Sequence, residues 1–181
     1  MSNYRRAHIR GGTYFFTVNA LRRRPILTQA PVRAALRDAI ARTRLTHPFA
    51  IDAWVLLPDH LHCIWTLPPG DADFSVRWSM IKRLVSQRCA AEYGAAELSL
   101  SATGRKESGL WQRRFWEHQI RDDNDFARHV DYIHWNPVKH DLVAKAIDWP
   151  YSTFHRYVAD GAYGADWGRS EAAGFVNHFG E

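Results

Sequence analysis

The sequence predicts an α+β fold: a ferredoxin-like antiparallel sheet built in the order βαββαβ, with one additional helix towards the C-terminus. Two observations support this prediction. Short runs of aromatic and β-branched residues, typical of strands, occur four times along the chain. Around them, apolar residues recur every three or four positions, as in amphipathic helices. We expect two helices to cover one face of the sheet, which leaves the other face for the third helix or for a ligand.

The first four elements are predicted in the order strand, helix, strand, strand. Residues 13–19 read TYFFTVN and indicate a strand, and helical spacing of apolar residues follows over 31–46. Pro48 ends that helix. Residues 49–57 and 60–67 are predicted to form two further strands, joined by a tight turn and therefore antiparallel.

The second half of the chain repeats the alternation less clearly. A helix is expected over residues 73–93, followed by a polar, glycine-containing loop over 95–109. Residues 111–121 are predicted to form the fourth strand, and a third helix is expected over 123–137, ending at a proline. The segment 141–181 shows only short structured pieces.

The charge of the chain favours a nucleic-acid partner. The 181 residues carry a net charge of +5, and 20 of the 24 basic residues are arginines. Residues 1–60 are net +7, whereas the remainder is net −2. Arginine binds phosphate through a planar fork and stacks on bases. A genome rich in G and C would also raise arginine over lysine, so composition alone leaves both explanations open.

Membrane and secretory classes are not expected. No run approaches the roughly 18 apolar residues that a membrane helix needs. The first residues, MSNYRRAHIRGG, lack the apolar core of a secretory signal. Cys63 and Cys89 form no CxxC pair and no evident disulfide framework. We therefore expect a protein of the reducing cytoplasm.

The segment PDHLHCIWTLP, residues 58–68, carries the first candidate site. His60 and His62 are two positions apart on a predicted strand, so their side chains project to the same face. Two neighbouring imidazoles can bind a metal ion together. A zinc hydrolase would need further nitrogen or sulfur ligands, and Cys63 is expected on the opposite face. A histidine-triad hydrolase would need a third histidine where Ile64 stands.

The segment HVDYIHWNPVKHDLV, residues 129–143, carries the second candidate site. Tyr132 and Asn136 are four residues apart and share one helix face. Pro137 is expected to end the helix just after Asn136. A tyrosine is a poor nucleophile at neutral pH, but a divalent cation beside a phosphodiester would assist its attack. The covalent phosphotyrosine would keep the bond energy, so rejoining would need no ATP.

Three segments together resemble the REP-associated tyrosine transposases, relatives of single-tyrosine insertion-sequence transposases in the His-hydrophobe-His endonuclease superfamily. They are LLPDHLHCIWTLP, LWQRRFWEHQIRDDNDFARHVDYIHWNPVKHDLV and WPYSTFHRY. The resemblance covers most of the chain, so we expect one catalytic domain over 1–157 and a tail of uncertain structure over 158–181. It implies an RRM-like sheet and a bacterial, cytoplasmic, nucleoid-associated protein, favoured as a monomer, with a dimer as the alternative.

The resemblance also implies a site. His60, His62 and Asn136 would bind Mg²⁺ or Mn²⁺, and Tyr132, on the third helix, would attack single-stranded DNA near a hairpin-forming palindromic repeat. The implied activity is that of a metal-dependent endonuclease and strand transferase that forms a 5′-phosphotyrosine. The alternative is a non-catalytic, RRM-like nucleic-acid-binding protein.

Further candidates lie outside this set. Glu117 and His118, on the predicted fourth strand, alternate between faces, so one of them could contact or orient a metal ligand. Two arginine groups, an N-terminal arm and a loop after the first strand, are expected to contact DNA phosphates. They comprise Arg5, Arg6, Arg10, Arg22, Arg23 and Arg24.

Overall fold

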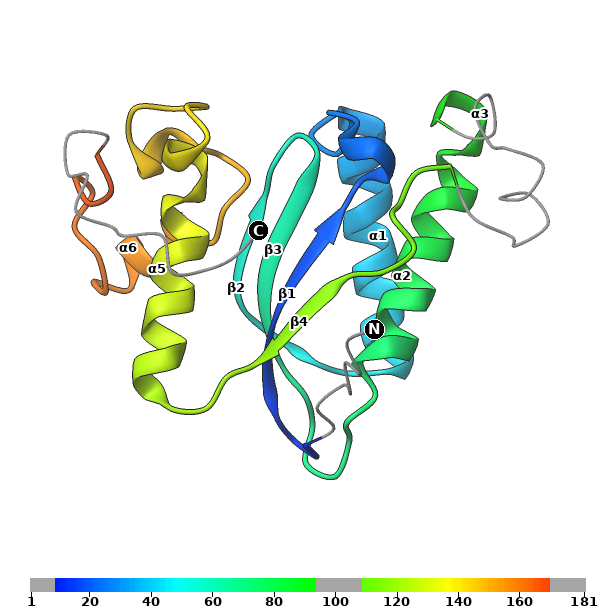
Figure 1. The fold of residues 1–181 in the computed structure, drawn as a ribbon, viewed down its shortest axis with the longest axis horizontal. Coiled ribbons are helices and arrows are strands. Elements are labelled where there is room, and N and C mark those ends of the chain that lie inside the picture. Colours follow the sequence, from blue (N-terminus) through cyan, green and yellow to red (C-terminus); the bar gives the residue numbers. More distant parts are fainter. Residues whose placement is uncertain (1–8, 94–108, 170–181) are drawn as a thin grey trace, which may run out of the picture.

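The computed structural model describes residues 9–93 and 109–169, which form a four-stranded sheet with helices on both faces (Figure 1). All neighbouring strands are antiparallel, and their order across the sheet is β2-β3-β1-β4. The strands are β1 (Thr13–Asn19), β2 (Ala50–Leu56), β3 (His60–Thr66) and β4 (Trp116–Gln119). The predicted α+β, ferredoxin-like fold is confirmed, with β1 and β3 at the centre.

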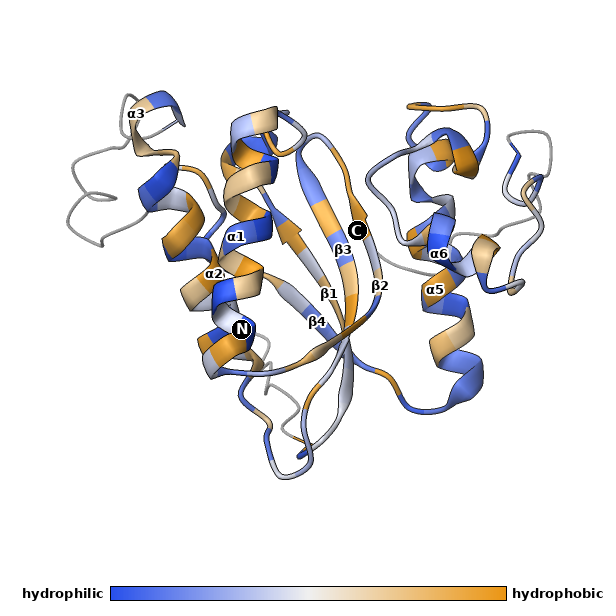
Figure 2. Cartoon of the chain, turned by 180° about the vertical axis from the view of Figure 1, so that it is seen from behind, coloured by the Kyte–Doolittle hydropathy of each residue, from blue (hydrophilic) through white to orange (hydrophobic). Residues whose placement is uncertain are grey.

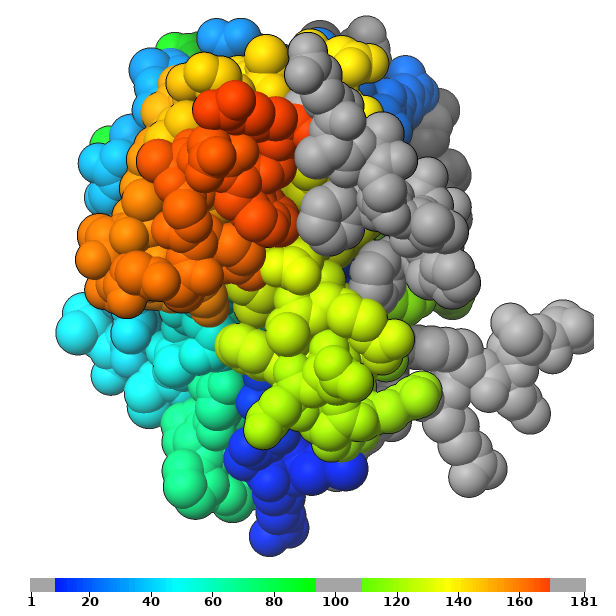
Figure 3. All heavy atoms as spheres, turned by 90° about the vertical axis from the view of Figure 1, so that its left-hand side faces the viewer, coloured from blue at the N-terminus to red at the C-terminus, as the bar shows by residue number. Residues whose placement is uncertain are grey.

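Helices cover the two faces unequally. One face packs against α1 (Ala30–Thr46) and α2 (Phe74–Arg88), and the other against α5 (Asp123–Lys139) (Figures 1 and 2). Seen from the side of α5, this helix and the chain that follows it form one continuous layer (Figure 3). The shorter elements are η1 (Leu21–Arg23), α3 (Ala90–Tyr93), η2 (Ala146–Asp148) and α6 (Phe154–Ala159).

The alternation of side chains along β3 decides what each face carries. Leu61 and Trp65 pack into the core beneath α1 and α2, where apolar residues from all layers meet. His60, His62 and Ile64 point the other way, towards α5, because successive strand residues face opposite sides. The sheet therefore places its histidine pair under the third long helix.

The core between the sheet and α2 is aromatic. Trp65 on β3 stacks on Trp78 of α2, with ring centroids 4.2 Å apart and an angle of 16° between the planes. Phe16 contacts both Trp65 and Trp78. All three side chains are at most 1% exposed. Burial of each such ring stabilises the fold by roughly 1.5–3 kcal/mol, which fixes the sheet on this side.

Helix α5 begins and ends at identifiable residues. Asp122 caps it by accepting a hydrogen bond from the Asp125 N–H at 2.8 Å. The helix was expected to end at Pro137, but it continues to Lys139. A proline this near the end removes only one ladder bond, and the last turn is closed by the His140 N–H, which donates to the Asn136 carbonyl at 3.0 Å.

Three other boundaries differ from the sequence prediction. The helix expected over 73–93 breaks at Cys89, between α2 and α3. The fourth strand is short, because of residues 111–121 only 116–119 form a ladder with β1. Part of the loop expected over 95–109 lies outside the described residues. In the C-terminal part, α6 continues to Ala159, past residue 157, which was expected to be the last residue of the catalytic domain.

Within the described part of the chain, no helix is both long enough and apolar enough to cross a lipid bilayer.

The buried imidazole of His134 makes stability depend on pH. Burial, with a smaller contribution from the charge of Arg156, lowers the pKa of His134 to about 3. In the unfolded chain a histidine has a pKa of roughly 6.5. The unfolded state therefore binds a proton more readily, and stability should fall as pH falls through 6.5 towards 3. We expect a loss of roughly 2 kcal/mol from this group between pH 7 and pH 5.

Urea unfolding at pH 7 and pH 5 measures this loss. His134→Leu should lose correspondingly less stability between the two pH values than wild type, whereas His155→Gln, which changes an exposed histidine on α6, should behave as wild type. An unchanged pH dependence in His134→Leu would contradict the assignment.

Candidate active site

The histidine pair on β3 lies buried beneath α5. Both side chains point to the same face, and each residue is 1% exposed. Their ring centroids are 4.8 Å apart, with the planes at 84°. The strand period therefore brings the two imidazoles together as expected, and α5 shields them from solvent.

A carboxylate fixes the tautomer of His60. The Nδ1 of His60 lies 2.7 Å from Oδ1 of Asp59. An ionised carboxylate can only accept, so Nδ1 carries the proton and Nε2 presents its lone pair. Among the described residues, this buried Nε2 has no hydrogen-bond partner. Burial lowers the pKa of His60, and the Asp59 contact opposes this only in part, so the ring is neutral at pH 7.

His62 is oriented by a neighbouring strand. Its Nδ1 lies 2.9 Å from the hydroxyl of Thr17, which faces it across the β1–β3 ladder. Asp59, behind His60, is itself ion-paired with Arg23 at 2.8 Å. Both rings thus have a polar partner at Nδ1, the usual arrangement behind metal-binding histidines.

Three residues of α5 and its C-cap lie at successive helical turns and face this pair. The ring of Tyr132 is 5.2 Å from that of His62, and the ring of His140 is 5.2 Å from that of His60. Asn136 lies between them in sequence, four residues from each, and therefore on the same helix face. The site thus combines β3 and α5 over two turns of the helix.

The amide of Asn136 is fully buried. The residue is 0% exposed, and neither Oδ1 nor Nδ2 has a hydrogen-bond partner within residues 9–93 and 109–169. Such groups are rare in folded proteins because each costs about 1–3 kcal/mol. Together with the orphaned Nε2 of His60, the amide indicates a place for a further polar group or ion.

The donor set fits a divalent cation. Two imidazoles and an amide oxygen supply nitrogen and oxygen ligands, and Mg²⁺ or Mn²⁺ accepts such sets while keeping open positions for phosphate oxygens or water. His60, His62 and Asn136 are the residues that would hold the ion.

Two neighbours of the site were not predicted from the sequence. The ammonium of Lys139 donates to the hydroxyl of Tyr132 at 3.4 Å and lies 5.0 Å from the centre of its ring. His140 packs against His60, as described above. Their spacing in the sequence could have indicated both neighbours. Lys139 and His140 follow Tyr132 by seven and eight residues, about two helical turns, and therefore lie on the same side of the helix.

The two strand candidates, Glu117 and His118, lie elsewhere. Glu117 pairs with Phe16, so its buried side chain faces α1 and α2 and not the histidine pair. His118 faces α5, where its Nε2 lies 2.8 Å from Asp125.

The predicted DNA-binding arginines differ in their surroundings. Arg5 and Arg6 lie outside the described residues. Arg10 and Arg22 are exposed, and Arg22 has a left-handed backbone with φ of 54°. Arg23 is paired with Asp59, as noted, and Arg24 lies 3.4 Å from two backbone carbonyls.

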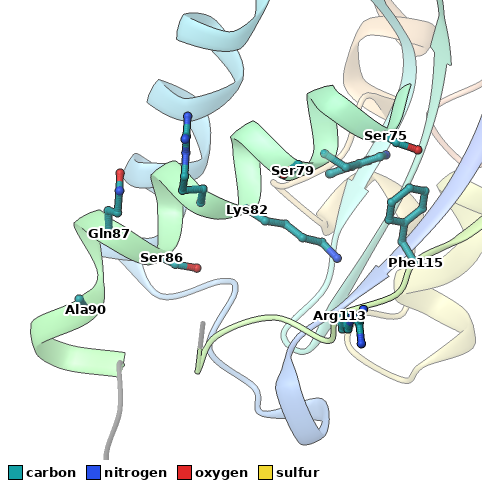
Figure 4. Close-up of a pocket in the computed structure, with 10 residues that line it drawn as sticks. Ser75, Ser79, Lys82, Ser86, Gln87, Ala90, Arg113 and Phe115 are labelled. Carbon is teal, nitrogen blue, oxygen red and sulfur yellow. The ribbon is translucent and has the colours of Figure 1, made fainter. Parts of the chain in front are cut away.

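A basic groove lies on the other face of the sheet from this site. It runs between α2 and the segment that leads into β4, with Lys82, Arg113 and Phe115 along it (Figure 4). Lys82 donates to the backbone carbonyl of Gln112 at 2.9 Å. The groove contains none of the residues predicted from the sequence to form a site.

Comparison with known proteins gives close relatives, although no family model matches the chain. The REP-associated tyrosine transposase of Escherichia coli is 49% identical over 167 residues, which are 92% of this chain and 91% of that protein. A relative from Haemophilus influenzae is 42% identical over 168 residues, 93% of this chain and 94% of its own.

A solved structure agrees with these relatives. It is that of a REP-associated tyrosine transposase bound to a REP hairpin, and it superposes with a TM-score of 0.80 at 48% identity. The match covers 99% of this chain and 95% of that one. The fold and the sequence together define a transposase-type enzyme. The chain belongs to the REP-associated tyrosine transposase family, as the resemblance of its motifs implied.

The buried amide of Asn136 generates a stability prediction. Asn136→Leu removes two unsatisfied polar atoms while nearly keeping the volume, so it should stabilise the metal-free protein by about 1 kcal/mol. Urea unfolding in the presence of a chelator measures the change.

Asn124→Leu serves as the control because it alters an exposed asparagine in the first turn of the same helix and should leave stability almost unchanged. A clear destabilisation by Asn136→Leu would mean that the amide has a partner in the folded protein.

Proposed function

We propose that this chain is a divalent-metal-dependent endonuclease and strand transferase for single-stranded DNA, with Tyr132 as the nucleophile. One observation carries the proposal. The phenol ring of Tyr132 lies 5.2 Å from the ring of His62, one helical turn before a buried amide that lacks a partner. The phenol and the amide thus lie on one face of α5, and the phenol contacts the histidine pair of β3.

The reaction would be an in-line displacement at phosphorus. The hydroxyl oxygen of Tyr132 forms a bond to the phosphorus, the bond to the 3′ oxygen breaks, and the DNA end remains attached as a 5′-phosphotyrosine. The phenol proton passes to solvent, and the departing 3′ oxygen takes up a proton from water. Mg²⁺ or Mn²⁺, when bound, would polarise the phosphate and stabilise the charge that develops there.

The residues around the phenol assist this step. The ammonium of Lys139, 3.4 Å from the hydroxyl, favours loss of the phenol proton through its positive charge. Packing of the phenol against His62 and Phe15 restricts its rotation, so the oxygen is positioned before DNA arrives. Because the phosphotyrosine keeps the energy of the phosphodiester bond, a free 3′-hydroxyl could reverse the reaction and join a new strand.

The substrate class comes from the relatives. The solved relative is bound to a REP hairpin, and this chain aligns with it over nearly its whole length. The positive charge of residues 1–60 is suited to a nucleic acid. We infer that the substrate is a single strand that folds into a REP-type hairpin.

The alternative, a non-catalytic RRM-like binding protein, is less consistent with the fold. RRM-type binding presents aromatic residues on an open sheet face. Here α5 covers that face (Figure 1). Phe15, on the central strand β1, is 1% exposed beneath it. Bases could not stack there without displacing the helix.

The covalent adduct provides the direct test. Wild-type protein incubated with a labelled hairpin oligonucleotide and Mg²⁺ or Mn²⁺ should yield a labelled band on a denaturing protein gel. Tyr132→Phe should lose the adduct and retain DNA binding within about threefold, because only the nucleophilic oxygen is removed.

Tyr151→Phe is the matched control, because Tyr151 packs against Arg33 away from the histidine pair and should form adduct normally. Cleavage that survives Tyr132→Phe would indicate a water nucleophile, and binding without cleavage under either metal would favour the alternative.

The contact between Lys139 and Tyr132 generates a second prediction. Lys139→Met should slow adduct formation at pH 7 by about 10- to 100-fold, because an uncharged side chain no longer favours the phenolate. The deficit should shrink as pH rises, since hydroxide then removes the phenol proton. Single-turnover rates between pH 6 and pH 10 measure the shift.

Lys145→Met, which changes an exposed lysine, should leave the pH profile unchanged. A deficit in Lys139→Met that is equally large at every pH would show that the lysine does not act through the phenol proton.

A further inference from the structure

A second group of potential metal ligands lies where β4 leads into α5. His118 is on β4, Asp125 is in the first turn of α5, and His129 follows one turn later. One potential ligand atom from each residue lies within 4.8 Å of those of the other two. Two elements that are joined by only a short connection thus bring two imidazoles and one carboxylate together.

The contacts within this group centre on the carboxylate. Oδ2 of Asp125 lies 2.8 Å from Nε2 of His118 and accepts a hydrogen bond from the Arg121 N–H at 3.1 Å. Its Oδ1 lies 3.2 Å from Nδ1 of His129 and 3.7 Å from the exposed guanidinium of Arg128. Nδ1 of His129 is also 2.7 Å from the Asp125 carbonyl. The two imidazole rings stack, with centroids 4.7 Å apart and an angle of 15° between them.

Hydrogen bonds to Asp125 and the burial of His129 keep the group in the form that binds metals. Asp125 is 6% exposed and His129 is 2% exposed. Burial alone would raise the pKa of Asp125, but hydrogen bonds from His118 and from the Arg121 N–H hold it below its usual value. Burial also lowers the pKa of His129. A carboxylate beside a neutral imidazole is therefore present at pH 7, as metal binding requires.

We propose that His118, Asp125 and His129 form a second divalent-cation site, separate from the histidine pair of β3 and suited to Zn²⁺ or Mn²⁺. Two histidines and one carboxylate are a recurrent ligand set for such ions, which leaves the remaining positions to water. Binding requires the lone pair of His118 Nε2, so the proton shared with Asp125 moves to Nδ1 or is released.

The ring of Phe15 separates the two groups. Its centroid is 5.4 Å from the ring of His62 on one side and 4.9 Å from the ring of His129 on the other. The proposed ligands, on β4 and α5, do not include any residue of β3. An ion at one site therefore needs no ligand from the other.

The ion would hold α5 against the sheet. His129 precedes Tyr132 by three residues, so both lie on the same helix face, and both contact Phe15. Linking β4 to the first two turns of α5 would restrict movement of the turn that follows. This consequence for the nucleophile rests on the proposed function, whereas the cation site itself does not.

Counting bound ions tests the proposal. The full-length chain, stripped with a chelator and dialysed against micromolar Mn²⁺ or Zn²⁺, should bind two ions by elemental analysis. Asp125→Asn and His118→Gln should each weaken one of the two at least tenfold. The double variant His60→Ala/His62→Ala should retain the ion at this second group.

Thermal unfolding provides an independent readout. Zn²⁺ should raise the melting temperature of wild type and of the His60→Ala/His62→Ala variant, and the rise in that variant should disappear when Asp125→Asn is added to it. His155→Gln, the control for loss of an exposed histidine, should respond as wild type. Circular dichroism of each metal-free variant checks that it folds.

The outcomes separate the two sites. One ion in wild type that is lost with His60→Ala/His62→Ala, or no ion at all, would overturn this proposal and leave the three residues as a hydrogen-bonded clamp. One ion that is lost only with His118→Gln or Asp125→Asn would support the second site. It would also show that the histidine pair of β3 binds no ion, which would contradict the metal dependence in the proposed function.

Discussion

The packing of α5 across the histidine-bearing face of the sheet is the constraint on which the site depends. It places a phenol, two imidazoles and an amide side by side, and none of the four residues is more than 8% exposed. Polar atoms buried without partners destabilise a fold. The apolar contacts of Phe15, Ile64 and Ile133 around the site offset that cost. The arrangement is thus one that stability alone does not favour, which is typical of functional sites.

Each half of the site could be predicted from local periodicity. His60 and His62 share a face because a strand alternates with a period of two, and Tyr132 and Asn136 share one because a helix repeats every 3.6 residues. That the two halves meet depends on which sheet face α5 covers. The sequence of α5 does not determine which face of the sheet the helix covers. The expectation that Tyr132 and Asn136 meet the histidine pair therefore came from the resemblance of three segments to a known family.

The parts that sequence reasoning missed have physical causes. Glu117 and His118 lie on opposite faces as expected, but the sequence did not say which of them faces α5; the register of β4, with Glu117 opposite Phe16, turns Glu117 away from that helix. Lys139 and His140 lie beyond Pro137, where the helix was expected to stop. Because the proline removes a single bond near the end, the helix continues, and both residues reach the site.

Both histidine groups use a carboxylate to set the proton position, but in different ways. Asp59 lies behind His60 and leaves Nε2 towards α5, whereas Asp125 lies between its two imidazoles. Arg23 pairs with Asp59 in a partly exposed position, where an ion pair contributes little to stability. The orientation of His60 depends on the hydrogen bond to Asp59 and not on that ion pair. Arg23 could therefore leave Asp59 and bind a DNA phosphate while the hydrogen bond to Asp59 still holds His60 in place. The ion pair between Arg23 and Asp59 is thus compatible with the predicted role of the loop after the first strand in DNA binding.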